Sequence, residues 1–156
     1  MNSDFGLYIV ATPIGNLGDI SERAITTIRE GDLIICENPK HSLKLLNKLG
    51  IKKKLISLHD HNEELVISKV KNSLKNKIIV LISDAGSPLI SDPGFKLIKH
   101  CYENNVYTTT IPGPSSIISA LQLSSLPINE FYFSGFFPKS IKHMNDFISS
   151  IKDKKQ

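Results

Sequence analysis

The sequence predicts an α/β fold, with a mainly parallel five-stranded sheet flanked by helices. Short apolar runs alternate along the chain with segments whose apolar residues recur at helical spacing. Short loops connect them, which favours right-handed βαβ units and parallel strands. The 156 residues are 40% hydrophobic and 22% charged, which is typical of a folded globular chain and not of a disordered one.

Five apolar or β-branched runs are the expected strands. One of them, Ile78–Ile82, is apolar throughout, as in a parallel strand that is buried on both faces. Phe131–Phe133 is expected to begin one more strand, in a second domain. The five strands of the sheet are expected over residues 7–10, 33–36, 55–58, 78–82 and 107–111.

Helices are expected between these strands. Asp19, with Glu22 three residues later, matches a capping box and predicts a helix that ends at Gly31. Asn62 is expected to cap a long helix whose apolar positions keep helical spacing. The remaining helices are expected at about residues 42–48, at 95–104, after Ser116 and, with a looser pattern, from Lys139.

Cysteine usage and the absence of hydrophobic spans favour a soluble cytoplasmic protein. Cys36 and Cys101 lack the spacing of a metal site or a redox pair, so buried free thiols in a reducing compartment are expected. The first residues lack the pattern of a signal peptide. No apolar run approaches the ~20 residues that cross a bilayer, so no membrane association is expected.

Loops rich in Gly and Pro follow three of the predicted strands, over Thr12–Gly18, Ser83–Gly94 and Pro112–Ser116. The second of these is about twice as long as a usual strand-to-helix connection. Because ligands bind beyond the carboxyl ends of strands in open α/β sheets, we expect the loops to converge as rigid walls of a site. Tight turns without a ligand remain the alternative. Neither a phosphate-binding P-loop nor a dinucleotide fingerprint is present.

Few side chains in these loops or elsewhere are candidates for binding or catalysis by their residue type. Asp84 and Asp92 are placed to accept hydrogen bonds from ligand hydroxyl or amino groups, although an Asx turn would also explain Asp92. His59 and His61 stand two residues apart without an obvious third ligand, so no metal is expected. No serine has the context of a hydrolase nucleophile.

The net charge of +4 is unevenly distributed. One stretch holds six lysines and no acid, which is suited to attracting phosphate groups. A solvated helix face would give the same pattern. The lysines are Lys40, Lys44, Lys48, Lys52, Lys53 and Lys54.

Five motifs in this order resemble the bacterial 16S ribosomal RNA cytidine 2′-O-ribose methyltransferases of the tetrapyrrole-methylase superfamily. They occupy residues 7–20, 59–63, 83–94, 111–115 and 135–139. The resemblance implies that residues 1–127 form the N-terminal α/β methylase domain. It implies that residues 128–156 begin a truncated C-terminal methylase domain.

The resemblance also implies an activity and a set of site residues. The activity is methyl transfer from S-adenosyl-L-methionine to a ribose 2′-hydroxyl of a cytidine in the 16S rRNA of the small ribosomal subunit. Family members are commonly homodimers. The six lysines become expected RNA contacts, and Glu37, His61 and Glu63 are open candidates for a catalytic base. The implied cofactor-binding residues are Pro13, Ile14, Gly15, Asp84, Gly86, Ser87, Pro88, Pro112, Ser115 and Ser116.

One segment departs from the family pattern. Where the family usually has Glu-Asp-Thr-Arg, this chain has Glu37-Asn38-Pro39-Lys40, and lysine does not replace arginine at a bidentate site. With the short length, this keeps open a catalytically silent fragment that binds RNA or mediates dimerisation. A small-molecule methylase acting on a tetrapyrrole is a further alternative, against which the first loop and the basic stretch argue.

Overall fold

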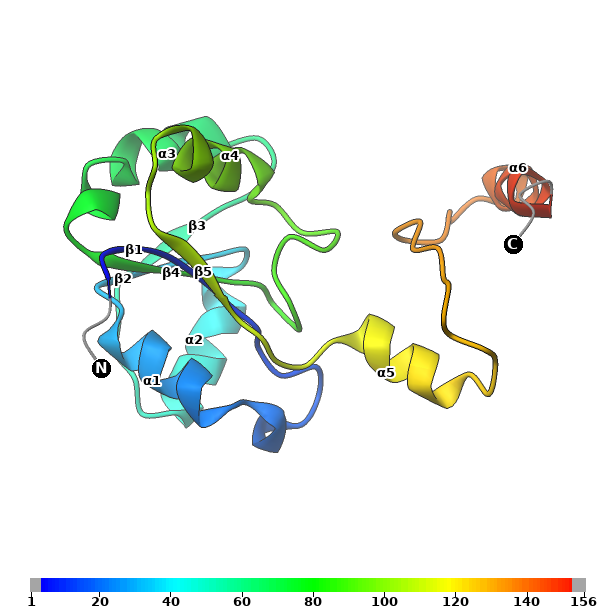
Figure 1. Cartoon of the computed structure of the whole chain (residues 1–156), viewed down its shortest axis with the longest axis horizontal. Coiled ribbons are helices and arrows are strands. Elements are labelled where there is room, and N and C mark those ends of the chain that lie inside the picture. Colours follow the sequence, from blue (N-terminus) through cyan, green and yellow to red (C-terminus); the bar gives the residue numbers. More distant parts are fainter. Residues whose placement is uncertain (1–3, 153–156) are drawn as a thin grey trace. The chain divides into compact units, whose positions relative to one another are not determined.

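The computed structural model describes residues 4–152, and the chain falls into two compact units that divide between Leu126 and Pro127. The first unit contains the sheet, whose strands and helices are labelled in Figure 1. The expected domain boundary lies one residue further along the chain. That the second unit begins a further methylase domain stays a prediction.

The sheet has five strands, all parallel, in the order β3-β2-β4-β1-β5. This confirms the predicted fold class. Val10 of β1 pairs with Ile82 of β4 and Ile111 of β5, and Cys36 of β2 also pairs with Ile82. Cys36 also pairs with Ser57, the last residue of β3, so all five strands end at one level and the loops that follow them start side by side. The strands are β1 (Gly6–Val10), β2 (Leu33–Cys36), β3 (Leu55–Ser57), β4 (Ile78–Ile82) and β5 (Thr108–Ile111).

Two pairs of helices cover the sheet, one pair on each face (Figure 1). Helices α1 (Glu22–Glu30) and α2 (Pro39–Lys48) lie on one face. Helices α3 (Glu63–Val70) and α4 (Phe95–Glu103) lie on the other. Each pair encloses its own core because successive side chains of a strand point to opposite faces.

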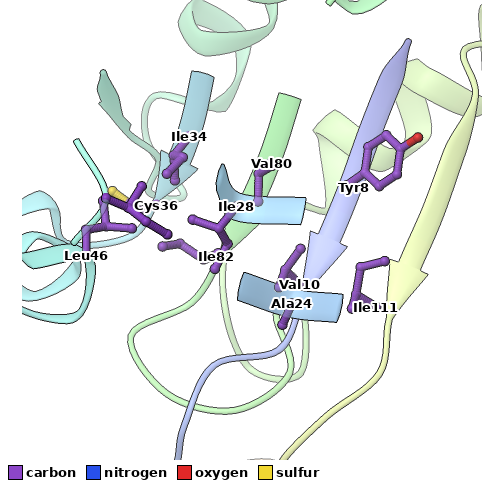
Figure 2. Close-up of a cluster of buried hydrophobic side chains, with 11 residues drawn as sticks. Tyr8, Val10, Ala24, Ile28, Ile34, Cys36, Leu46, Val80, Ile82 and Ile111 are labelled. Carbon is purple, nitrogen blue, oxygen red and sulfur yellow. The ribbon is translucent and has the colours of Figure 1, made fainter. Parts of the chain in front are cut away.

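Strand β1 shows this division. Its Leu7 belongs to the core under α3 and α4, whereas Tyr8 and Val10 belong to the core under α1 and α2. Figure 2 shows the second of these cores, where side chains of four strands meet Ala24 and Ile28 of α1. Leu7, Val10 and Ile28 have no exposed surface, so both faces of the sheet are fully covered here.

Helix α1 does not begin as the sequence pattern predicts. Asp19 belongs to a short 3-10 helix, η1 (Leu17–Asp19), which Asn16 caps by accepting a hydrogen bond from the Gly18 N–H at 3.0 Å. The cap of α1 is Ser21, whose hydroxyl oxygen accepts from the Ala24 N–H at 3.1 Å. The predicted capping box of Asp19 and Glu22 is therefore wrong, because the chain makes an extra turn before the helix.

Helix α2 begins three residues earlier than expected. The Asn38 side chain accepts from the N–H groups of Lys40 at 3.1 Å and His41 at 3.2 Å, and Pro39 occupies the first helical turn. Proline suits this position because its missing N–H would have no helical partner. The segment that departs from the family pattern thus forms a well-capped helix start.

The long helix expected after Asn62 is shorter and is not capped as predicted. It ends at Val70, and a 3-10 helix, η2 (Ser73–Lys75), follows. The Asn62 side chain makes no cap hydrogen bond. It accepts from the His59 N–H at 2.9 Å and donates to the Ser57 carbonyl at 3.0 Å, so it holds the loop after β3 instead.

The rest of the chain contains two further helices, α5 (Ser116–Leu123) and α6 (Ile141–Lys152), as expected. The expected strand at Phe131–Phe133 is wrong: these residues have no regular structure and their side chains are exposed. A strand forms only where a neighbour takes up its backbone groups, and no described strand pairs with this segment. Both cysteines are buried free thiols, as expected. None of the helices in residues 4–152 is long and apolar enough to cross a membrane.

Candidate functional site

The three Gly- and Pro-rich loops meet at Gly86, as the sequence predicts. The Thr12 N–H donates to the Gly86 carbonyl at 2.9 Å, and the Gly86 N–H donates to the Thr12 carbonyl at 3.0 Å. A side chain on Gly86 would place its Cβ 3.2 Å from Ile14 Cγ2 and 3.5 Å from the Pro114 carbonyl oxygen. With its φ of 77°, this position requires glycine. The loops after β1, β4 and β5 therefore form one structure.

The far end of the β4 loop is anchored by Glu63 of α3. This side chain is 5% exposed, and its Oε1 accepts from the Gly94 N–H at 3.3 Å. Its Oε2 accepts from the N–H groups of Lys96 at 2.8 Å and Leu97 at 3.3 Å. Glu63 thus caps α4, whose own N-cap residue has no side chain to do so.

Between its two anchors, the β4 loop contains two residues whose backbone conformation is unfavourable for their type. Leu89 has a φ of 73° and Ser91 a φ of 65°, in the left-handed region that non-glycine residues rarely occupy. Such strain persists only where surrounding contacts impose it, and it is frequent in binding loops. The strained residues lie between the bridge to Thr12 and the hydrogen bonds to Glu63, which hold the loop toward its two ends.

Asp84, the second residue of the β4 loop, carries an unpaired buried atom. Its Oδ1 is buried and has no hydrogen-bond partner among the described residues. A buried carboxylate oxygen without a partner is costly, so nearly all such atoms in folded proteins are satisfied. This oxygen is therefore an acceptor available to a ligand.

Two other carboxyl groups lie near Asp84. Burial raises the pKa of Glu37, which follows β2, and the negative charges of Asp84, Asp92 and Asp60 raise it further. Burial also raises the pKa of Asp92; the charge of Asp84 adds to this and a hydrogen bond with Ser83 opposes it. Glu37 and Asp92 line one small hollow together. The carboxyl edge of β2 and β4 is thus a negatively charged region that favours a positively charged ligand.

A larger cavity of about 410 Å³ lies beside this region, in the first unit. The loop after β1 lines one side of it with Pro13, Ile14 and Gly15. Helix α2 lines another side with Lys44 and Lys48, together with His41. Asp84 and Ala85 complete it from the β4 loop.

The structure brings together part of the predicted cofactor set. Pro13, Ile14, Gly15 and Asp84 line the cavity, Pro88 lines the small hollow, and Gly86 joins the loops. Among the described lining residues of these two spaces, four predicted residues do not occur, namely Ser87, Pro112, Ser115 and Ser116. Their roles stay predictions.

The predicted RNA-binding and catalytic residues are also divided. Lys44 and Lys48 line the cavity, whereas Lys40, Lys52, Lys53 and Lys54 are not among its described lining residues. Of the catalytic candidates, Glu37 and His61 are both exposed, and Glu37 lines the small hollow, whereas Glu63 is buried in the cap of α4. The described residues contain no cluster of His, Cys, Asp or Glu that could hold a metal ion.

Sequence reasoning missed two features of the site. It did not place α2 beside the loop after β1, because that needs the strand order, although the spacing of His41, Lys44 and Lys48 already puts them on one helix face. It also missed the capping role of Glu63, whose partners are 31 to 34 residues away in the chain.

The sequence is similar to known proteins over most of its length. Residues 6–147 match the family Tetrapyrrole (Corrin/Porphyrin) Methylases. The chain is 50% identical over 141 residues to the Ribosomal RNA small subunit methyltransferase I of Rickettsia prowazekii, covering 88% of this chain and 49% of that protein. The identity is 45% over 151 residues to the protein of the same name from Haemophilus influenzae, covering 94% and 52%.

Solved structures show the same fold. The crystal structure of uroporphyrin-III-C-methyltransferase from Thermus thermophilus has a TM-score of 0.57 at 15% identity, over 81% of this chain and 54% of that one. A putative cobalamin synthesis related protein (CobF) from Corynebacterium diphtheriae has a TM-score of 0.56 at 16% identity, over 82% of this chain and 61% of that one. The chain spans about half the length of the curated relatives described above.

Proposed function

The chain belongs to the tetrapyrrole methylase family. We propose that it takes part in the S-adenosyl-L-methionine-dependent methylation of 16S ribosomal RNA. The proposed acceptor is the 2′-hydroxyl of a cytidine ribose, as the sequence motifs imply. Relatives that are 41–50% identical over most of this chain are named Ribosomal RNA small subunit methyltransferase I, which supports an rRNA substrate.

The single observation that carries the proposal is the unpaired, buried Oδ1 of Asp84 at the junction of the three loops. S-adenosyl-L-methionine, when bound, supplies an activated methyl group on a positively charged sulfur. The acidic region around Asp84 suits a ligand with that charge, and Asp84 Oδ1 suits a donor group of its ribose or amino-acid portion. The residues present therefore fit the cofactor.

The chain's own contribution to the reaction is mainly positioning. The backbone bridge between Thr12 and Gly86 fixes the loops before a ligand arrives, so little conformational freedom is lost on binding. Aligning the acceptor oxygen with an activated methyl group is itself a large part of the catalysis of such a transfer.

We assign the proton acceptor to Glu37. A ribose hydroxyl is a poor nucleophile until a base helps to remove its proton. The raised pKa of Glu37 makes its carboxylate a stronger base than an ordinary one, and it lies in the hollow next to the β4 loop. Both oxygens of Glu63 already accept backbone hydrogen bonds, and His61 lines neither described hollow.

The proposal includes the small ribosomal subunit as partner, a cytoplasmic location and a homodimer, which the family resemblance implies. Exposed apolar side chains on α5, with Ile118 at 50% and Leu123 at 86%, support association with another surface. The solved tetrapyrrole-pathway structures are at most 16% identical and speak for the fold alone, so they do not favour a tetrapyrrole substrate.

A transfer assay tests the proposed function. Small ribosomal subunits that lack the modification are incubated with the chain and radiolabelled S-adenosyl-L-methionine, and the labelled nucleoside is identified. We expect 2′-O-methylcytidine with the unmodified chain and with Glu103→Gln, a control at the far end of α4. Asp84→Asn is expected to lower the rate at limiting cofactor. Binding of RNA without any transfer would favour the silent RNA-binding alternative.

A further inference from the structure

Helix α2 presents two different faces to its surroundings. Ser42 and Leu46 are buried against the sheet. Lys44 and Lys48, one turn apart, are exposed on the flank that lines the 410 Å³ cavity. Residues four apart on a helix are neighbours, so the two ammonium groups can act on a single ligand group.

These two lysines have no acidic partner in the part of the chain that the structure describes. The ion pairs found there join Lys96 to Glu64 and Lys99 to Glu103, both on the other face of the sheet. No acid occurs between Lys40 and Lys54 that could neutralise them locally. Their charge is therefore available to a ligand in the cavity.

The cavity has opposite charges on its two sides. Lys44, Lys48 and His41 lie on the α2 side, and Asp84 is the acid on the β4-loop side. Burial and then the charge of Asp84 raise the pKa of both Glu37 and Asp92, so two further carboxyl groups lie near Asp84. An anionic group is attracted to one side and a cationic group to the other.

We propose that Lys44 and Lys48 form a phosphate clamp, which holds the RNA backbone next to the ribose that is methylated. This rests on the proposed function, because it takes Asp84 to mark the methyl-donor side. Phosphate contacts set the register of a protein on a nucleic acid. The clamp thus selects which 2′-hydroxyl faces the donor.

The other lysines of the basic stretch have a different role. Lys52, Lys53 and Lys54 follow α2 in the connection to β3 and do not belong to the described lining of the cavity. They contribute general attraction for RNA, which is screened by salt. The basic stretch therefore contains a pair of lysines that positions the RNA and a separate group of lysines that attracts it.

Matched double variants test the clamp. The first variant combines Lys44→Gln with Lys48→Gln. The second combines Lys52→Gln with Lys54→Gln. Each removes two exposed charges from the same stretch. The affinity of each full chain for a 16S ribosomal RNA transcript is measured over a range of salt concentrations, without cofactor. The first variant is expected to lose roughly tenfold in affinity, and its salt slope to fall by about 1.4, as for two lost contacts to single-stranded RNA. The second is expected to lose about threefold or less. Equal losses would overturn the clamp.

A footprint on the unaltered chain gives a second readout. Lysines are acetylated with and without the transcript, and the modified positions are identified by mass spectrometry. Protection of Lys44 and Lys48 while Lys52 and Lys54 still react supports the clamp, and uniform protection contradicts it. Both measurements are made without methyl transfer. An inactive chain that shows the selective loss and protection would overturn the proposed function and leave only the phosphate contact of Lys44 and Lys48 standing.

Discussion

The two sides of the cavity are built in different ways. The β4-loop side is held by backbone hydrogen bonds to Thr12 and to Glu63, and its main-chain conformation is strained in places. The α2 side is a regular, well-capped helix that presents flexible lysine side chains. The first side is suited to directional recognition, for which atoms must be fixed in advance. The second side is suited to attracting a charged group, for which the positions of the atoms need not be fixed in advance.

The largest effect is expected from a substitution at Glu63, which anchors the β4-loop side. Glu63→Gln replaces one carboxylate oxygen by an amide NH₂, which cannot accept from the N–H groups at the start of α4. Charged hydrogen bonds of this kind are worth about 2–3 kcal/mol, so we expect a loss of that size in the free energy of unfolding, measured in urea. Glu64→Gln is the matched control, because Glu64 makes only an exposed ion pair with Lys96. Equal stability of Glu63→Gln and the unaltered chain would contradict the capping role.

A second change tests the junction of the loops. Gly86→Ala combines a positive φ with a Cβ only 3.2 Å from Ile14, and should cost about 1–2 kcal/mol of stability and weaken donor binding. Gly50→Ala is a control for the φ alone, since Gly50 has a φ of 66° and open space at its Cβ. If the two variants lose equal stability and bind the donor equally well, the contact at Ile14 is unimportant.

A smaller effect is expected at Thr12. This side chain is fully buried, and its hydroxyl donates to the Ser83 carbonyl at 3.3 Å, which ties the loop after β1 to the loop after β4. Thr12→Val keeps the shape and removes the donor, so we expect a loss of about 1 kcal/mol in the free energy of unfolding. No loss in thermal or urea unfolding would show that the backbone bridge alone joins the loops.

The smallest expected effect is a dependence of donor affinity on pH. The raised pKa of Glu37 means that its carboxyl group is protonated at a higher pH than an ordinary glutamate. As the pH falls through this pKa, the site loses negative charge and attracts a cationic donor less strongly. Affinity should therefore decline toward acidic pH, with protons released on binding, as titration calorimetry in buffers of different ionisation enthalpy can measure. Glu37→Gln should flatten that part of the profile; an unchanged profile would assign the titration to another group.

Much of the fold is predictable from local pattern. The apolar or β-branched runs place every strand of the sheet to within a residue at each end. The central strand Ile78–Ile82 is apolar throughout because it is buried, whereas the edge strand Thr108–Ile111 is partly exposed and is identified by its β-branched residues. Helix starts are harder, since several polar residues compete to cap them. Asn16 and Ser21 displace Asp19, and Asn38 starts α2 early. Phe131–Phe133 does not form a strand, because an apolar pattern does not show whether a neighbouring strand is present to pair with it.

The site is predictable in its loops and less so in its side chains. Glycine and proline content identifies three loops that do converge, because these residues permit the tight backbone approach at Gly86. The unpaired oxygen of Asp84 and the capping role of Glu63 depend on contacts between distant segments. Which of the lysines reach the cavity depends on the order of the strands, which brings α2 beside the loop after β1.

The most direct test of the central claim is calorimetric titration of the chain with S-adenosyl-L-methionine. We expect saturable heat for the unaltered chain and for Glu103→Gln, and an affinity ten- to a hundredfold lower for Asp84→Asn, as for the loss of one charged hydrogen bond of about 1.5–3 kcal/mol. Asp84→Asn should keep or raise the stability of the fold, because it removes the negative charge from a side chain whose buried oxygen has no partner. No heat at millimolar cofactor, or equal affinity for Asp84→Asn, would contradict the assignment of this site.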